Sequence, residues 1–358
     1  MARALVIGGT GFVGRHAVAN LDGHGYDVTS LGRGGHPFDF DDWPDVEQRR
    51  GDRTDPQVIE DVARGLEPDV VVDCAAFHPS DVRRATEAFA DADAYVLVSS
   101  GGAYADQDIP KREDETRLHD CTPEQAADDT MATYGPRKAE CDRIAREAAE
   151  RGVAATSVRS TVVYGPQTIS EAGDGGAGWA DKIPAAWTHG DAPGLQSHHD
   201  YWIHRVARHD RVVVPGDGTA IWHRVFVGDL AEALRVVAER GVPGEAYNAA
   251  DRTVCTLADV VALIAGALDT DVEVVKASER DLANAGLDPG DFPLYHHPMT
   301  GYPHVLDTCK LASLGWESTP PERAIERTVE ESIAGDRDGS GWGPERDVEE
   351  RLLDAVDG

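Results

Sequence analysis

Long apolar runs are missing from this 358-residue sequence: no stretch of about 18 apolar residues offers a membrane-spanning helix. Cysteine is sparse as well, since the five cysteines are widely spaced and form no C-x-x-C pair. This spacing disfavours both a disulfide framework and a zinc site, so we expect reduced thiols and no bound metal. A strand-like segment starts at residue 4 and leaves no room for a signal peptide. The expected location is therefore cytoplasmic.

Lysine is scarce too, and arginine supplies most of the 34 basic residues, which are opposed by 65 acidic ones. The formal net charge is −31. Such a polyanion repels nucleic acid and anionic membranes, so neither is an expected partner. The carboxylates are dispersed along the whole chain, as in proteins from salt-accumulating halophiles, where high ionic strength screens the self-repulsion. We therefore expect a halophilic source.

A glycine-rich turn joins the first strand to the first helix. Residues 4–7 are apolar, the turn spans residues 8–14 (GGTGFVG), and a helical pattern extends from Arg15 to Asp22. Glycine permits the tight reversal and the close approach of a pyrophosphate, whose charge would be met by the free N–H groups of the helix N-terminus. An ordinary βα turn is the alternative, but the placement favours a dinucleotide site. The expected cofactor contacts in the turn are Gly8, Thr10, Gly11, Phe12, Val13 and Gly14.

Strand and helix patterns alternate through the first half of the chain. Residues 70–73 and 94–100 have the continuous apolar character of buried parallel strands, and helical patterns separate such segments. This alternation predicts an α/β fold with a Rossmann-like, doubly wound parallel sheet. We expect three parts: a dinucleotide-binding Rossmann domain at 1–165, a smaller interleaved C-terminal substrate lobe at 166–335 with some segments returning to the sheet domain, and a peripheral acidic tail at 336–358.

A tyrosine and a lysine share one face of a later helix. Tyr134 and Lys138 lie one helical turn apart near the start of a pattern that continues to Arg151. A phenol with an ordinary pKa near 10 is a weak base, but a nearby ammonium and the positive helix end favour phenolate. Such a tyrosine can exchange a proton with a substrate hydroxyl while hydride moves to or from a nicotinamide. Ser100, at the end of a buried strand, can donate a hydrogen bond to the reacting oxygen.

These ordered motifs resemble the extended and atypical short-chain dehydrogenase/reductase families, the NAD(P)-dependent epimerase/dehydratase group. The resemblance covers about residues 1 to 330 and also includes Gly51-Asp52, Cys74-Ala75-Ala76, the segment from Ser99 to Tyr104, Tyr164-Gly165-Pro166, the segment from His223 to Ala231, and Tyr247-Asn248-Ala249. It implies that Ser100, Tyr134 and Lys138 are catalytic. It further implies cofactor contacts from Asp52, Ala75, Ala76, Ser99, Tyr134 and Lys138, and substrate contacts from Tyr104 and Arg224. A homodimer through two helices of the sheet domain is implied by the resemblance alone.

The end of the second strand bears on the choice of cofactor. It reads Leu31-Gly32-Arg33, without the acidic residue that would bind a ribose 2′-hydroxyl. Arg33 suits a 2′-phosphate, so we expect NADP rather than NAD; the alternative is that Arg33 stacks on the adenine and discriminates little.

The resulting hypothesis is an NAD(P)-dependent oxidoreductase or epimerase that acts on a sugar or sugar nucleotide. Its alternative is a non-catalytic, dinucleotide-bound regulatory or RNA-binding protein of the atypical branch. The motifs do not identify the substrate, nor do they separate epimerase, dehydrogenase, reductase and dehydratase.

Overall fold

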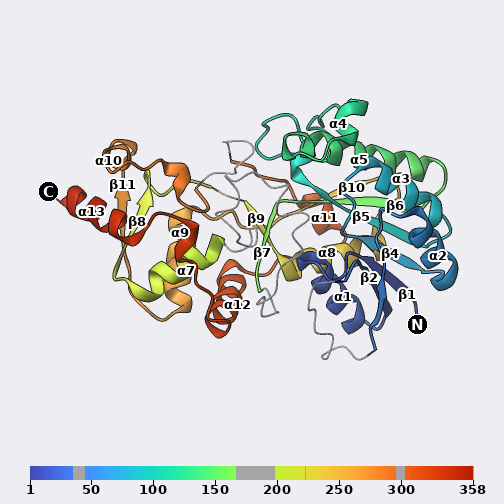
Figure 1. Cartoon of the computed structure of the whole chain (residues 1–358), viewed down its shortest axis with the longest axis horizontal. Helices are drawn as coiled ribbons and strands as arrows, with labels where there is room; N and C mark the ends of the chain where they lie inside the picture. Colours follow the sequence, from blue (N-terminus) through green and yellow to red (C-terminus); the bar gives the residue numbers. More distant parts are fainter. Residues whose placement is uncertain (35–44, 167–197, 222, 296–302, 358) are drawn as a thin grey trace.

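The computed structural model describes residues 1–34, 45–166, 198–221, 223–295 and 303–357. They form two lobes, with the N-terminus in the right-hand lobe of Figure 1 and the C-terminus in the left-hand one. The right-hand lobe contains a seven-stranded parallel sheet in the order β10-β6-β5-β4-β1-β2-β3. Its strands are β1 Arg3–Ile7, β2 Asp27–Gly32, β3 Glu47–Arg50, β4 Val70–Asp73, β5 Ala94–Ser100, β6 Ala155–Ser160 and β10 Ala246–Ala249.

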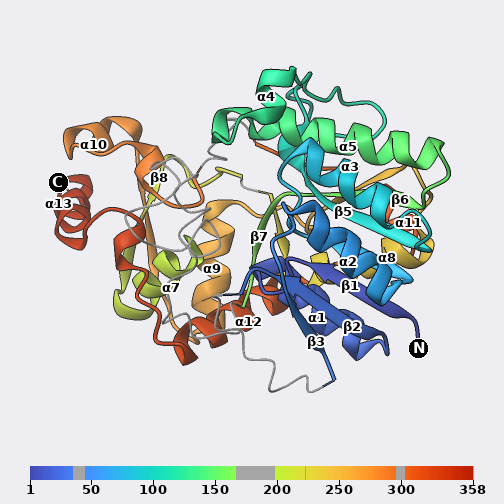
Figure 2. The same ribbon diagram turned by 45° about the vertical axis from the view of Figure 1, so that its right-hand side comes forward.

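Helices cover both faces of this sheet (Figure 2). One face is packed by the apolar sides of α1 and α8, and the other by α2, α3 and α5. The bounds in this lobe are α1 Phe12–Gly23, α2 Pro56–Leu66, α3 Pro79–Ala88, α4 Pro123–Ala127, α5 Tyr134–Glu150, α8 Val227–Arg240 and α11 Cys309–Ser313, with short 3₁₀ turns η1 Gly101–Ala103 and η2 Met131–Thr133. The expected Rossmann-like parallel sheet is confirmed.

The character of each strand follows from its place in the sheet. The central strands β1, β4 and β5 are apolar on both sides because helices cover both faces, and their residues are almost all buried. The edge strand β3 reads Glu-Gln-Arg-Arg and is largely exposed. Strand order reverses at β1, which lies between β4 and β2. Ligands of such sheets bind outside the carboxyl ends of the strands at this reversal, where the glycine-rich turn lies.

The left-hand lobe packs helices around a two-stranded parallel sheet. Its core contains the buried side chains of Trp202, Val213, Ile264 and Phe292. A second parallel pair, β7 with β9, lies between the two lobes in Figure 1. The bounds are β7 Val162–Tyr164, α7 His198–Arg208, β8 Arg211–Pro215, β9 Arg224–Phe226, α9 Leu257–Ala267, β11 Glu273–Ala277, α10 Glu279–Asn284, η4 Pro289–Asp291, α12 Pro321–Ala334, η5 Ser340–Trp342 and α13 Arg346–Asp357. Within the described ranges, no helix is both long and apolar enough to cross a bilayer.

The residues expected to form a peripheral acidic tail are packed into the left-hand lobe instead. Trp342, Leu352 and Leu353 belong to its hydrophobic core. Glu349 is fully buried, and its Oε2 lies 2.9 Å from Nε of Arg205. The acidic tail forms an amphipathic helix: Glu349, Leu352 and Leu353 of α13 are buried, while Asp347, Glu350 and Asp354 are exposed.

Candidate functional site

The glycine-rich turn forms a cradle at the N-terminus of α1. Gly8 adopts a positive φ of 82°, its carbonyl accepts the N–H of Gly11 at 2.9 Å, and α1 begins at Phe12. The first turn of α1 has no acidic side chain, so its unsatisfied N–H groups and positive dipole end are available to an anion. The turn therefore fits a pyrophosphate, as the sequence predicts.

Close packing explains why the turn needs glycine. A Cβ on Gly14 would lie 2.0 Å from the carbonyl oxygen of Gly8, and a Cβ on Gly9 would lie 2.3 Å from Oγ of Ser30. A Cβ on Gly8 would lie 2.9 Å from Cβ of Ala75, which places one expected cofactor contact directly against the turn. Of the other expected contacts, Phe12 packs edge-on against His16, and Thr10 lies beside Gly32.

Two exposed arginines lie at the carboxyl ends of β2 and β3. Arg33 comes directly after β2, and Arg50 is the last residue of β3. Nε of Arg50 donates to the carbonyl oxygen of Arg33 at 2.8 Å, which holds the two residues side by side. Nearby, the carboxylate of Asp52 accepts the backbone N–H and the hydroxyl of Thr54; these bonds, followed by the charge of Arg33, lower its pKa. This edge of the sheet thus combines two cations with one oriented carboxylate.

The proposed catalytic residues converge from β5 and α5. Ser100 ends β5, and its Oγ accepts the N–H of Gly102 at 3.1 Å within the turn η1. The start of α5 packs on this turn so tightly that a Cβ on Gly135 would lie 2.6 Å from the carbonyl oxygen of Gly102. Tyr134 is the first residue of α5 and is partly exposed. The fold therefore brings Ser100 and Tyr134 to the same edge of the sheet, although 33 residues separate them.

Lys138 lies behind Tyr134 and is buried. Its Nζ donates to the carbonyl oxygens of Ala76 at 2.8 Å and Val98 at 3.0 Å. The ammonium lies 5.2 Å from the ring centroid of Phe77 and 5.9 Å from that of Tyr134. An ammonium has three N–H donors, and two are used on these carbonyls, so one is left for a ligand or for the tyrosine. Its side chain thus joins the segment after β4 to the start of α5.

Two residues expected near ligands are buried away from the open edge. The Tyr104 hydroxyl donates to Oδ1 of Asn248 at 2.8 Å and accepts from Nη1 of Arg159 at 2.9 Å. Burial raises the pKa of Tyr104 to about 12, so this phenol stays protonated. Ser99 is only 2% exposed. Tyr104 thus belongs to an internal network, whereas Tyr134 is partly exposed at the edge of the sheet.

Arg224 lies in a buried polar cluster between the lobes. Its guanidinium stacks 4.8 Å above the ring of Tyr164 and donates to Nε2 of His199. Burial, followed by the charge of Arg224, holds the pKa of His199 well below its usual value, so the neutral imidazole accepts this bond. The Tyr164 hydroxyl in turn donates to Oδ2 of Asp251 at 3.0 Å. Arg224 is 4% exposed, so a substrate pyrophosphate would reach it only if this cluster opened.

The carboxyl group of Asp251 makes this cluster sensitive to pH. Burial raises the pKa of Asp251 from 3.8 to about 7. Between those two values the folded state binds more protons than the unfolded state, so stability falls as pH rises from about 4 to about 7. We expect Asp251→Asn to reduce this fall by up to about 1.4 kcal/mol per pH unit. Urea unfolding of both proteins at several pH values tests this, and parallel stability curves would contradict it.

The sequence did not predict two arginines beside the site, Arg50 and Arg53. Arg50 is hydrogen-bonded to the backbone of Arg33, and Arg53 is buried against Asp73, the last residue of β4. The available sequence signal was an aspartate that ends an otherwise apolar strand, because a carboxylate at such a place requires a buried partner.

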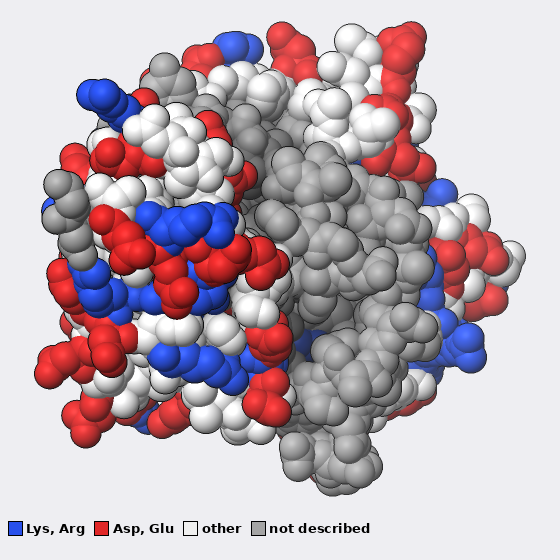
Figure 3. All heavy atoms as spheres, turned by 60° about the vertical axis from the view of Figure 1, so that its left-hand side comes forward, with Lys and Arg blue, Asp and Glu red and all other residues white. Residues whose placement is uncertain are grey.

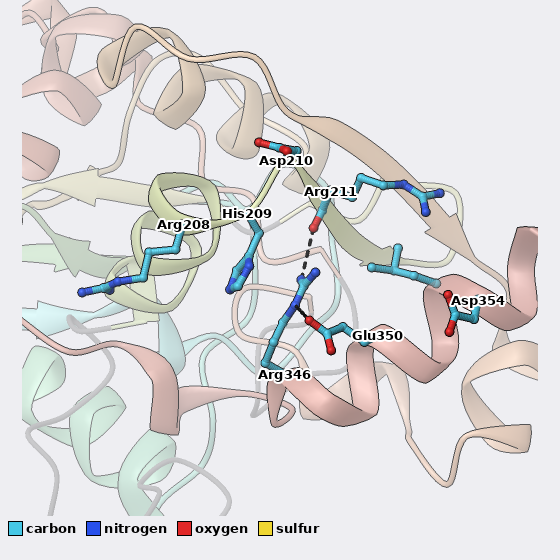
Figure 4. Close-up of a pocket in the computed structure, with 8 residues that line it drawn as sticks. Arg208, His209, Asp210, Arg211, Arg346, Glu350 and Asp354 are labelled. Atoms are coloured by element: carbon cyan, nitrogen blue, oxygen red, sulfur yellow. Dashed lines mark hydrogen bonds and ion pairs between the residues drawn. The ribbon is translucent and has the colours of Figure 1, made fainter.

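A shallow hollow lies elsewhere, on the left-hand lobe. Figure 4 shows it lined by side chains of both signs, with Arg346 between Glu350 and the backbone of Arg211. Two of its arginines are paired with carboxylates, Arg211 with Glu273 and Arg346 with Glu350. Across the described ranges, no three His, Cys, Asp or Glu side chains are grouped as a metal site.

Comparison with known proteins connects this geometry to a family. The sequence model of the NAD-dependent epimerase/dehydratase family matches residues 4–185 and 188–250. The fold is similar to that of UDP-glucose 4-epimerase from Thermotoga maritima, solved with UDP-glucose (20% identity, TM-score 0.64, 94% of this chain and 100% of that one). It is also similar to dTDP-glucose 4,6-dehydratase from Bacillus anthracis in complex with NAD (18% identity, TM-score 0.65, 97% and 100%).

A plant protein is similar in sequence. The chloroplast stem-loop binding protein of 41 kDa b from Arabidopsis thaliana is 25% identical over 258 residues, which are 69% of this chain. The match spans 58% of the plant protein's length.

Proposed function

Because the chain belongs to the NAD-dependent epimerase/dehydratase family, we propose that it is an NAD(P)-dependent oxidoreductase or epimerase acting on a sugar or sugar nucleotide. The observation that carries the proposal is the convergence of Ser100, Tyr134 and Lys138 at the edge of the sheet that also holds the glycine-rich turn. The UDP-glucose and dTDP-glucose named for the similar structures make nucleotide sugars the first substrates to test.

The cofactor fits the residues present. The cradle at the N-terminus of α1 would hold its pyrophosphate, Arg33 and Asp52 would flank its adenosine half, and Lys138 would face its nicotinamide half. When bound, a nicotinamide cofactor accepts or returns a hydride.

Residues of the chain transfer the proton that accompanies the hydride. Tyr134 exchanges a proton with the substrate oxygen at its phenol oxygen, and Ser100 donates a hydrogen bond to the same substrate oxygen. The ammonium of Lys138 lies 5.9 Å from the centroid of the Tyr134 ring, and its third N–H donor is available to a ligand or to the tyrosine.

A panel of UDP- and dTDP-sugars with NADP(H) and NAD(H) in high salt tests this function. Absorbance of the reduced nicotinamide detects net redox turnover, and NMR of the sugar detects epimerisation or dehydration without it. Binding of a cofactor with turnover of one panel member supports the proposal, and an enzyme that binds no nicotinamide cofactor contradicts it.

We propose NADP as the preferred cofactor, because Arg33 and Arg50 lie together where a ribose 2′-phosphate would approach. Arg33→Met is expected to weaken NADPH binding about 10- to 100-fold, the value of charge-assisted bonds to a phosphate, and to leave NADH binding nearly unchanged. Titration of NADPH and NADH fluorescence measures both affinities. Arg49→Met is the control, because it removes the neighbouring charge on β3, which pairs with Glu47 at 2.9 Å. Equal loss for both cofactors in Arg33→Met would contradict the contact with the 2′-phosphate and would indicate that Arg33 stacks on the adenine and discriminates little.

A second candidate function, RNA binding, is favoured by the similarity to the plant stem-loop binding protein. The net charge of −31 opposes it, and Figure 3 shows acidic residues intermingled with basic ones on the visible face. Filter binding of a stem-loop RNA at low salt tests this candidate: affinity that falls steeply with added salt would favour it.

The homodimer, the cytoplasmic location and the halophilic source stay predictions.

A further inference from the structure

One buried arginine connects the two segments that face the cofactor site. Arg53 directly follows Asp52, and its side chain extends inward to the end of β4. Its Nη1 lies 2.9 Å from both carboxylate oxygens of Asp73, and its Nη2 donates to the carbonyl oxygen of Asp81 at 2.9 Å. The arginine is 7% exposed, and the two aspartates are 0% and 4% exposed. These charges are therefore shielded from water and depend on each other.

The two aspartates hold the backbone of the intervening loop. Oδ1 of Asp73 accepts the N–H of Ala75 at 3.1 Å. Oδ2 of Asp81 accepts the N–H groups of Phe77 at 3.1 Å and His78 at 3.0 Å. The loop after β4 is thus fixed at both ends by carboxylates that share one arginine.

This loop touches both halves of the candidate site. Ala75 packs against Gly8 of the pyrophosphate cradle, where a Cβ on the glycine would lie 2.9 Å away. The carbonyl oxygen of Ala76 accepts a hydrogen bond from Nζ of Lys138 at 2.8 Å. A shift of the loop therefore moves the floor of the cradle and the anchor of the lysine together.

We propose that Arg53 is a positioning residue for the nicotinamide cofactor, acting through Asp73 and Asp81 on the 74–78 loop and thereby on Lys138. The proposal rests on the proposed function, since it requires a dinucleotide at the cradle. Tyr95 supports the same arrangement, because its buried hydroxyl donates to Oδ2 of Asp73 at 2.8 Å.

The geometry requires arginine rather than any cation. A lysine at position 53 has a single ammonium on a flexible stem, which can satisfy Asp73 but not the carbonyl of Asp81 as well. Arg53→Lys therefore keeps the charge and loosens one end of the loop. We expect it to weaken NADPH binding by at least about tenfold, the value of one charge-assisted hydrogen bond, because the displaced loop carries the anchor of Lys138.

The matched control is Arg205→Lys in the other lobe. Arg205 is also buried, pairs with the buried Glu349 at 2.9 Å and donates to the backbone carbonyl of Pro344. Both variants are expected to lower Tm by a few degrees, but only Arg53→Lys is expected to weaken NADPH binding. Fluorescence titration and thermal unfolding of the full chain in high salt measure the two effects. If Arg53→Lys fails to fold, Asp81→Asn is tested instead. We expect this variant to bind NADPH at least about threefold more weakly than the unmodified protein.

A double-mutant cycle separates positioning from general destabilisation. Because the loop acts on Lys138 as well as on the cradle, substitution of Arg53 is expected to weaken NADPH binding by a clearly smaller factor in a Lys138→Met background than in an Arg33→Met background, where its full factor is kept. Three results would each overturn the proposal. Arg53→Lys could bind NADPH as tightly as the unmodified protein, or Arg205→Lys could lose as much NADPH affinity as Arg53→Lys. The third is that Arg53→Lys weakens NADPH binding by the same factor in the Lys138→Met and Arg33→Met backgrounds. If the unmodified protein binds no nicotinamide cofactor, the proposed function itself fails, and that result is distinct from the other three.

Discussion

Replacing Tyr134 with phenylalanine is expected to lower turnover about 10²- to 10⁴-fold, because it removes the proposed proton donor and acceptor at the reacting oxygen. The ring remains in place at the start of α5, so the contact with the ammonium of Lys138 is preserved. Cofactor affinity should therefore change little, and the loss should appear in kcat. Steady-state kinetics on the panel member that is turned over, together with NADPH titration, measure the two quantities.

A second tyrosine provides the control for this experiment. The hydroxyl of Tyr26 donates to Oε1 of Glu239 at 3.2 Å on the surface, so Tyr26→Phe also deletes a phenol oxygen but leaves the site untouched. Its kcat should equal that of the unmodified protein. Full activity in Tyr134→Phe would remove the acid/base role and with it the catalytic part of the proposed function.

Substituting Gly14 with alanine is expected to abolish measurable cofactor binding and to lower Tm by several degrees. The added Cβ would lie 2.0 Å from the carbonyl oxygen of Gly8, so α1 must move away from the turn. That movement withdraws the helix N-terminus from the pyrophosphate and opens the packing of Val18 and Leu21 beneath it. The cost combines a steric clash in a packed interior with the loss of ligand contacts.

Gly23 at the other end of the same helix is the matched control. A Cβ there has no neighbour within 4 Å, and alanine is the better helix former, so Gly23→Ala should bind cofactor normally and be as stable as the original or slightly more stable. Calorimetric titration with NADPH and thermal unfolding of both variants test the pair. Normal binding by Gly14→Ala would show that the cradle does not hold the pyrophosphate.

The parts of this molecule that the sequence predicts well are those encoded locally. The glycine-rich turn lies between a strand and a helix that are adjacent in the chain, and Tyr134 and Lys138 share a helix face through the 3.6-residue period. Apolar runs identify the buried strands for the same reason. These expectations depend on a few neighbouring residues, so no tertiary information is needed.

Features that depend on distant contacts could not be predicted in this way. The pairing of Arg53 with Asp73 requires knowledge that β4 ends beside the turn after β3, across β1 and β2. The motif that ends at Tyr104 does not reveal which way this side chain points. In the structure its hydroxyl contacts Asn248 and Arg159 rather than the open edge of the sheet. The burial of Glu349 depends on Arg205, which lies far away in sequence, and composition alone suggested a solvated tail.

The late position of the edge strand β10 in the chain affects folding during synthesis on the ribosome. This strand pairs with β6, but residues 161–245 separate the two strands in the chain, and α7 and β8 within that stretch belong to the other lobe. At about 5–20 residues per second, several seconds of synthesis pass before β6 can acquire this neighbour. Until then the nascent sheet presents β6 as a bare, pairing-competent edge, the kind of surface that invites chaperones or misassembly with a second nascent chain.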